Sequence, residues 1–148
     1  MSQNEKGKPV NNNPSVESIV KFLAAALDCN QRIISNFTGL NASTLSANIE
    51  KSFEEVLSKK VGKRLFALFF VVRHFSVQGI SPRIIKESLN EFVFPDEEGN
   101  FDSVISAIHS DKYTPAVLKN IGEIGLKRYQ AKLEAREKLF PAVKALTG

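Results

Sequence analysis

The chain has little of the chemistry on which most enzymes and metalloproteins depend. Its 148 residues include one cysteine, Cys29, two histidines, His74 and His109, and no tryptophan. A single cysteine excludes an internal disulfide and suggests a reducing, cytoplasmic location. Cys29 shares no metal-ligand spacing with either histidine, and no Gly-rich phosphate loop, nucleophile elbow or His-x-x-x-His pair is present. We therefore expect neither an enzyme nor a bound metal or cofactor.

Long hydrophobic runs are scarce as well. The longest is the apolar run at residues 65–72, which is too short to cross a bilayer because a spanning helix takes about 20 residues. The first residues, MSQNEKGKPVNNNPS, contain no apolar segment, so we expect neither a secretory signal nor a membrane partner. Residues 1–14 are polar and rich in asparagine, a composition that predicts a disordered tail.

Charges of the two signs are segregated along the chain. The formal net charge is +4, which suits an anionic partner without requiring one. From residue 112 onward, lysine and arginine outnumber glutamate. Acidic side chains gather before that point, with no lysine or arginine near them until Lys112, namely Asp96, Glu97, Glu98, Asp102 and Asp111. These acidic residues lack the glycine and glutamate positions of a calcium-binding EF-hand, so we interpret residues 96–102 as a solvated loop.

What the chain does contain is a set of helical patterns, organised around KRLFALFFVVRHFSVQ at residues 63–78. A surface helix shows one apolar stripe, so a helix that is apolar all round must be buried on every side. A strand is the rival interpretation because Phe and Val favour sheets. The length of the segment and the stop at Gly79 favour a helix. We predict a central buried helix over residues 61–78, within a bundle or at the seam of a dimer.

Apolar residues recur at helical spacing elsewhere, and no alternating pattern predicts a strand. The sequence therefore predicts one all-α domain of six or seven helices over residues 15–148. Further helices are expected near residues 15–28, 31–38, 42–58, 81–94, 101–108 and 115–140. Pro141 should stop or kink the last one, and its Gly122 and Gly125 either weaken it or admit another backbone. The predicted core consists of Leu65, Leu68, Phe69, Val72, Ile19, Leu23, Leu45, Ile49, Phe53, Ile85, Leu89 and Ile105, with Phe92 and Val93 on the buried face of helix 81–94.

The strongest functional signal is a shorter stretch, QRIISNFTGLNASTLSANIE at residues 31–50. Ile34 and Leu40 are apolar on either side of a turn at Gly39. Leu45 points back from the second helix, and Ser35 is small where two helices would cross. This stretch resembles the helix-turn-helix of Xre- and Cro-type DNA-binding proteins. The resemblance implies that the second helix lies in the major groove, with its N-terminal residues facing base edges.

The same resemblance implies a set of DNA-contacting residues. Asn41 is suited to adenine, and Ser43 or Ser46 to a phosphate, while Arg32 and Lys51 supply positive charge nearby. The predicted DNA-binding residues are Arg32, Asn41, Ser43, Thr44, Ser46 and Lys51.

The order of segments carries a second resemblance. The helix-turn-helix-like stretch is followed by the helical region RLFALFFVVRHFSVQGISPRIIKESLNEF and a loop that contains glycine. This order is similar to antitoxins of the Xre/MbcA/ParS type, whose C-terminal helical domain neutralises a toxin. It implies a DNA-binding transcriptional regulator with a toxin as protein partner. A homodimer is expected because one short helix-turn-helix reads too few bases.

Departures from the family pattern leave another class of function open. Thr38 and Asn48 stand where the family usually has apolar residues, the groove-facing side has no arginine, and Glu50 would repel phosphate. A plain helix hairpin with a glycine turn explains these features as well. The alternative hypothesis is therefore a helical adaptor or small structural subunit of a larger assembly that reads no DNA sequence.

Overall fold

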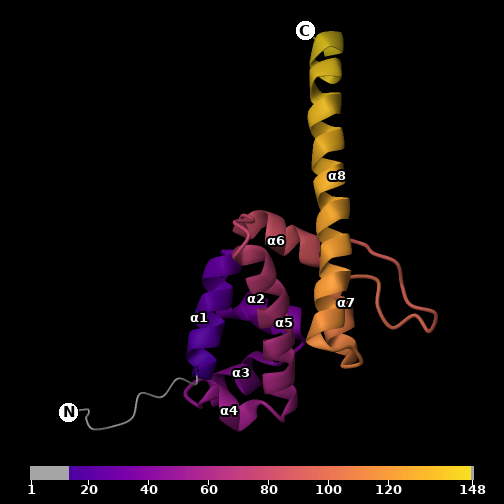
Figure 1. The fold of residues 1–148 in the computed structure, drawn as a ribbon. Helices are drawn as coiled ribbons and strands as arrows, with labels where there is room; N and C mark the ends of the chain where they lie inside the picture. Colours follow the sequence, from indigo (N-terminus) through magenta and orange to yellow (C-terminus); the bar gives the residue numbers. More distant parts are fainter. Residues whose placement is uncertain (1–13, 148) are drawn as a thin grey trace.

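The computed structural model describes residues 14–147, with side chains as far as Pro141 (Figure 1). This part of the chain contains helices and no strand, apart from one isolated β-bridge between Ser15 and Ser52. The predicted all-α fold is confirmed. The tail predicted at residues 1–14 lies, except for Pro14, outside the described residues. The helices are α1 (Val16–Leu27), α2 (Gln31–Thr38), α3 (Ala42–Asn48), α4 (Phe53–Val56), α5 (Lys60–Ser76), α6 (Pro82–Leu89), α7 (Val104–Ser110) and α8 (Pro115–Thr147).

Helix α5 is the centre of the fold. It packs most closely against α1 and α8 and also touches α2, α4, α6 and α7. Leu65, Leu68 and Val72 are fully buried, so the central helix was predicted correctly, within two residues at each end. It is not buried on every side, however, because Phe66 is half-buried and Phe70 is 36% exposed. Their rings pack on each other, with centroids 6.1 Å apart, at the surface of the molecule. The predicted core residue Phe69 is likewise only half-buried.

The third predicted helix, over residues 42–58, is wrong as one element. The chain forms two short helices there, α3 and α4, which raises the number of helices in the described chain to eight. Between them, the carbonyl groups of Ile49 and Lys51 accept hydrogen bonds from the backbone N–H groups of Glu17 and Val16, at 3.0 and 2.9 Å. The first N–H groups of any helix lack partners within it. The break after α3 therefore supplies acceptors for the start of α1, and it leaves Ile49 half-buried rather than in the core.

Helix α6 begins where predicted and ends early. Ser81 caps it and Pro82 occupies its first turn, but it stops at Leu89. The chain that follows is not helical, with Val93 buried and Phe92 49% exposed. Burial alternates along this stretch, with Glu91 and Val93 buried and Phe92 and Phe94 exposed, so Phe92 faces solvent although helical spacing predicts its burial.

Helix α7 begins later than predicted. It starts at Val104, where the Ser103 hydroxyl accepts the N–H of Ser106 and Ser106 bonds back to the N–H of Ser103 in a capping box. The predicted start near Phe101 is therefore wrong. Ile105, predicted in the core, is half-buried.

Helix α8 packs on α5 and α6 and then projects beyond the body of the molecule (Figure 1). The sequence predicts that Pro141 stops or kinks this helix. The helix does not stop there but continues to Thr147. A proline removes one helical hydrogen bond and leaves a carbonyl without a donor. Water can satisfy that carbonyl because residues 134–141 are exposed. Gly125 allows α8 to approach α6 closely, because a Cβ atom at this position would lie 2.7 Å from the carbonyl oxygen of Ser88 in α6.

Gly125→Ala should destabilise the fold, although alanine favours helices over glycine by about 1 kcal/mol. The new methyl group would meet the backbone of Ser88, which cannot retreat unless α6 shifts, and overpacking costs about 1–3 kcal/mol. Gly122→Ala is the matched comparison, because its methyl group would meet only side chains, the nearest atom being Val71 Cγ1 at 3.0 Å. Urea unfolding should give Gly125→Ala a lower free energy of unfolding than Gly122→Ala. A Gly125→Ala protein as stable as the wild type would contradict this packing.

Candidate nucleic-acid interface

Helices α2 and α3 form a pair joined by a tight turn at residues 39–41. Ile34 and Leu45 are fully buried and Leu40 is 8% exposed, which is the burial that their spacing predicts. Ser35 is 3% exposed, and its hydroxyl has no hydrogen-bond partner among the described residues. Ser35 therefore contributes to the packing of α2 through its small size and not through its hydroxyl group.

The turn after α2 is held by two side chains from distant parts of the chain. Arg64 of α5 donates from Nη1 to the carbonyl oxygens of Thr38 and Gly39, at 3.0 and 3.3 Å. The Nε2 atom of His109 lies 3.2 and 3.1 Å from the carbonyl oxygens of Asn36 and Phe37. The last carbonyl groups of a helix lack partners within it. Arg64 and His109 therefore add to the backbone N–H groups of Gly39 and Leu40, which reach the carbonyls of Asn36 and Ser35.

Gly39 is required at this turn for two reasons. Its φ is +70°, a left-handed conformation that residues with a Cβ atom resist. A Cβ atom would also lie 2.8 Å from Nη1 of Arg64. Thr38, unusual for a helix-turn-helix at its position, is fully buried, and its hydroxyl donates to the carbonyl of Ile34 at 2.8 Å. Its polar group is thus satisfied within α2, and the two helices close on each other.

The predicted DNA-binding residues lie mostly on the surface of this pair. Arg32 is exposed on α2, and Ser46 is exposed on α3, where its hydroxyl accepts a bond from the Gln31 amide at 3.3 Å. Asn41, Ser43 and Thr44 are exposed at the start of α3, and Lys51 is half-buried beyond its end. Glu50 is exposed near Lys51, so one negative charge borders the face.

The structure brings three of the predicted residues together in a hollow of about 580 Å³. Arg32, Ser43 and Ser46 are not part of it. Two further lysines from the start of α5, which sequence reasoning missed, complete it. We call this site the lysine hollow, and its polar lining consists of Asn41, Thr44, Asn48, Lys51, Lys59 and Lys60. The pair Lys59-Lys60 is visible in the sequence, but only the folded chain shows that it lines one hollow with the turn at residues 39–41.

The lysine hollow gathers positive charge from three lysines. Lys51, Lys59 and Lys60 form no ion pair within the described chain. Helix α5 begins at Lys60 with no acidic residue in its first turn and no side-chain hydrogen bond from its N-cap. The N-terminal end of a helix is itself partly positive, so lysines there add to the dipole instead of compensating it. An anion such as a phosphate group fits this arrangement.

Other parts of the described chain offer no comparable site. No three His, Cys, Asp or Glu side chains with described positions gather where they could hold a metal ion, and none of the described helices is both long and apolar enough to span a membrane. Asp96 is engaged within its own loop. The Tyr113 hydroxyl and the Asn100 backbone and side chain donate to its carboxylate and lower its pKa to about 2. Searches of family models, curated proteins and solved structures found no match to this chain.

Asp111 should make the stability of this turn depend on pH. Two hydrogen bonds from Arg64, at 2.9 and 2.8 Å, hold the pKa of Asp111 below its usual range, and the Lys60 charge lowers it further. A carboxyl group with a lowered folded pKa stabilises the fold above its unfolded pKa of about 3.9 and loses that contribution as the pH falls through its folded pKa. Between pH 7 and pH 3, wild type should therefore lose more free energy of unfolding than Asp111→Asn, as urea unfolding would measure.

Comparing wild type with Asp111→Asn also removes the contribution of the other carboxyl group that has a lowered pKa. Asp96 also has a lowered pKa, but it titrates in both proteins and cancels in the difference. At pH 7, Asp111→Asn should cost about 2 kcal/mol, the contribution of hydrogen bonds to a charged group. The cost stays below that of a fully buried pair because the Asp111 side chain is 48% exposed. Equal losses in the two proteins would show that Asp111 does not act through its charge.

Proposed function

We propose that this protein is a small DNA-binding regulator, which presents the start of α3 to the major groove and binds backbone phosphate in the lysine hollow. The observation that carries the proposal is that Lys51, Lys59 and Lys60 line one hollow together with Asn41 and Thr44. Phosphate contacts position a protein on DNA, and base contacts specify the sequence. Here both kinds of group are neighbours, and Asn41 has the side chain that pairs with adenine in the major groove.

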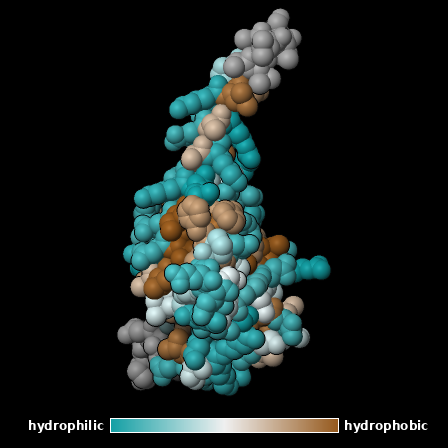
Figure 2. Space-filling view, turned by 90° about the vertical axis from the view of Figure 1, so that its right-hand side faces the viewer, coloured by the Kyte–Doolittle hydropathy of each residue, from teal (hydrophilic) through white to brown (hydrophobic). Residues whose placement is uncertain are grey.

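The regulator is proposed to act as a homodimer. Helix α3 has only seven residues and contacts too few bases alone, whereas two copies can read a palindrome. Leu139 and Phe140 are 61% and 65% exposed on the projecting part of α8, and Figure 2 shows a hydrophobic spot near the outer end of this part, next to hydrophilic side chains. This is the surface we favour for the second copy. A toxin partner, which the resemblance to antitoxins implies, would then bind elsewhere on the dimer.

A helical adaptor is the second candidate function, and a separate observation favours it. Phe92 and Phe94 are 49% and 64% exposed. The guanidinium of Arg128 lies 5.7 and 4.8 Å from the centroids of their rings. Aromatic residues and arginine are enriched at protein interfaces. An adaptor that uses this surface needs no DNA, so a DNA-binding measurement separates the two functions.

Changing both Ser43 and Ser46 to Glu should abolish sequence-specific DNA binding with little change in stability. Both serines are exposed on α3, so the new carboxylates would face phosphate while Leu45 between them stays buried. Selection from a randomised duplex library would first identify the preferred sequence, and fluorescence anisotropy would then measure affinity for it. We expect a loss of about 100-fold or more, because like charges across an interface cost several kcal/mol.

The matched control adds the same two charges elsewhere. Ala25 and Val77 are exposed near the ends of α1 and α5 that point away from α3 (Figure 1), so Ala25→Glu/Val77→Glu should bind DNA as wild type does. Unchanged affinity of the double serine variant would refute α3 as the recognition helix. A wild-type protein that enriches no sequence and binds no duplex at low salt would favour the adaptor.

If the lysine hollow binds phosphate, its lysines should contribute to the salt dependence of DNA affinity. Lys59→Ala and Arg32→Ala should each weaken binding to all sequences about equally and reduce the slope of log affinity against log salt by about one unit, as expected for one lost phosphate contact. Lys59 tests the hollow and Arg32 tests the exposed side of α2. Anisotropy titrations over a salt series would measure the slopes, with Lys127→Ala on the exposed surface of α8 as control. A Lys59→Ala slope equal to that of the control would exclude phosphate from the hollow.

A further inference from the structure

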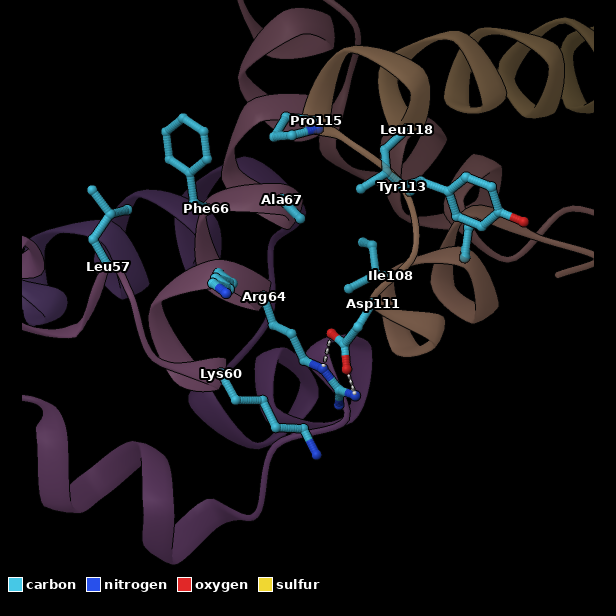
Figure 3. Close-up of a pocket in the computed structure, with 12 residues that line it drawn as sticks. Leu57, Lys60, Arg64, Phe66, Ala67, Ile108, Asp111, Tyr113, Pro115 and Leu118 are labelled. Atoms are coloured by element: carbon cyan, nitrogen blue, oxygen red, sulfur yellow. Dashed lines mark hydrogen bonds and ion pairs between the residues drawn. The ribbon is translucent and has the colours of Figure 1, made fainter. Parts of the chain in front are cut away.

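A second hollow, of about 590 Å³, shares Lys60 with the lysine hollow. Apolar side chains form its walls. Leu57 and Phe66 lie on one side of it, and Ile108, Tyr113 and Leu118 lie on the other (Figure 3). Its volume falls within the range of about 300–1,000 Å³ that is typical of small-molecule sites. We call it the apolar hollow.

The charges on the rim of the apolar hollow are unbalanced. Three cations, Lys60, Lys63 and Arg64, line it together with one carboxylate, that of Asp111. Arg64 is only 8% exposed, and all five of its N–H donors are engaged, two with Asp111 and three with backbone carbonyl groups. Asp111 therefore balances Arg64. Lys60 and Lys63 form no ion pair within the described chain, so their two positive charges remain for a ligand.

We propose that the apolar hollow binds a small amphipathic carboxylate. Its hydrocarbon part would lie between the walls formed by Phe66 and Leu118, and its carboxylate would pair with Lys60 and Lys63. A neutral apolar molecule would leave both ammonium groups without a counter-charge. A nucleic-acid backbone would gain nothing from the apolar walls, since its binding depends on charge. The ligand site uses no residue of α3, although it shares Lys60 with the lysine hollow.

Calorimetric titration of the full-length protein with decanoate, kept below its micelle concentration, tests the proposal. Decanoate should bind with one-to-one stoichiometry, and 1-decanol, which has the same chain without the charge, should bind at least tenfold more weakly. Lys63→Glu should weaken decanoate binding by tenfold or more. Lys63 is chosen because it lines only the apolar hollow, whereas Lys60 lines both. Lys127→Glu, the same charge change at an exposed residue of α8, should bind as wild type does.

A second variant tests the apolar walls. Leu57 is 46% exposed at the rim, so Leu57→Ser should leave the fold intact while it weakens decanoate binding several-fold. Saturating decanoate should also raise the melting temperature of wild type, because it binds the folded state, and should raise that of Lys63→Glu less. The proposal is overturned if decanoate does not bind, if decanol binds equally well, or if Lys63→Glu and Lys127→Glu bind alike. None of these measurements involves DNA, so they succeed or fail separately from the proposed regulator.

Discussion

The guanidinium of Arg64 joins three parts of the chain that lie far apart in sequence. It reaches from α5 to the carbonyl groups of Thr38 and Gly39 at the end of α2, to the His109 carbonyl in the last turn of α7, and to the carboxylate of Asp111 just after α7. Breaking a buried ion pair by removing one partner costs about 3–5 kcal/mol when both groups are fully desolvated. Arg64 itself is buried, and without it the carbonyl group of Thr38, the last residue of α2, would lose its donor. Arg64 therefore ties the end of α2 to α5 and α7, beside the contact that His109 makes.

Both candidate sites adjoin that contact. The lysine hollow lies beside the turn that Arg64 holds, and the apolar hollow is lined by Arg64 and Asp111 themselves. Lys59, Lys60 and Lys63 stand at the N-terminal end of α5, where the helix dipole disfavours positive charge. Such a cluster weakens the helix that carries the core. An anionic ligand at either hollow would relieve that cost, which is the physical reason that binding is proposed there.

Helix α8 combines two roles along its length. Its first half packs closely on the body, where Gly125 lets the helix approach the backbone of α6. Glu91, 8% exposed in side chain, pairs with Lys132 at 2.6 Å and fixes the point where the helix leaves the body. From Glu134 onward the side chains are exposed as far as Pro141. A helix without tertiary contacts is only marginally stable in water, so the projecting part is the element of this fold that would gain most from a partner.

Local patterns in the sequence determined the elements, and contacts between distant residues determined the sites. Helical spacing predicted the burial of Ile34, Leu45 and Leu68, because this signal acts within about four residues along one helix. The break between α3 and α4 was not predictable in this way, since it depends on N–H groups of α1 more than thirty residues away. Nor was the burial of Arg64, whose partner Asp111 lies 47 residues further on. The lysine hollow likewise exists only because α5 begins beside α3. The lysines and polar residues that line it are visible in the sequence, but only the tertiary structure brings them together.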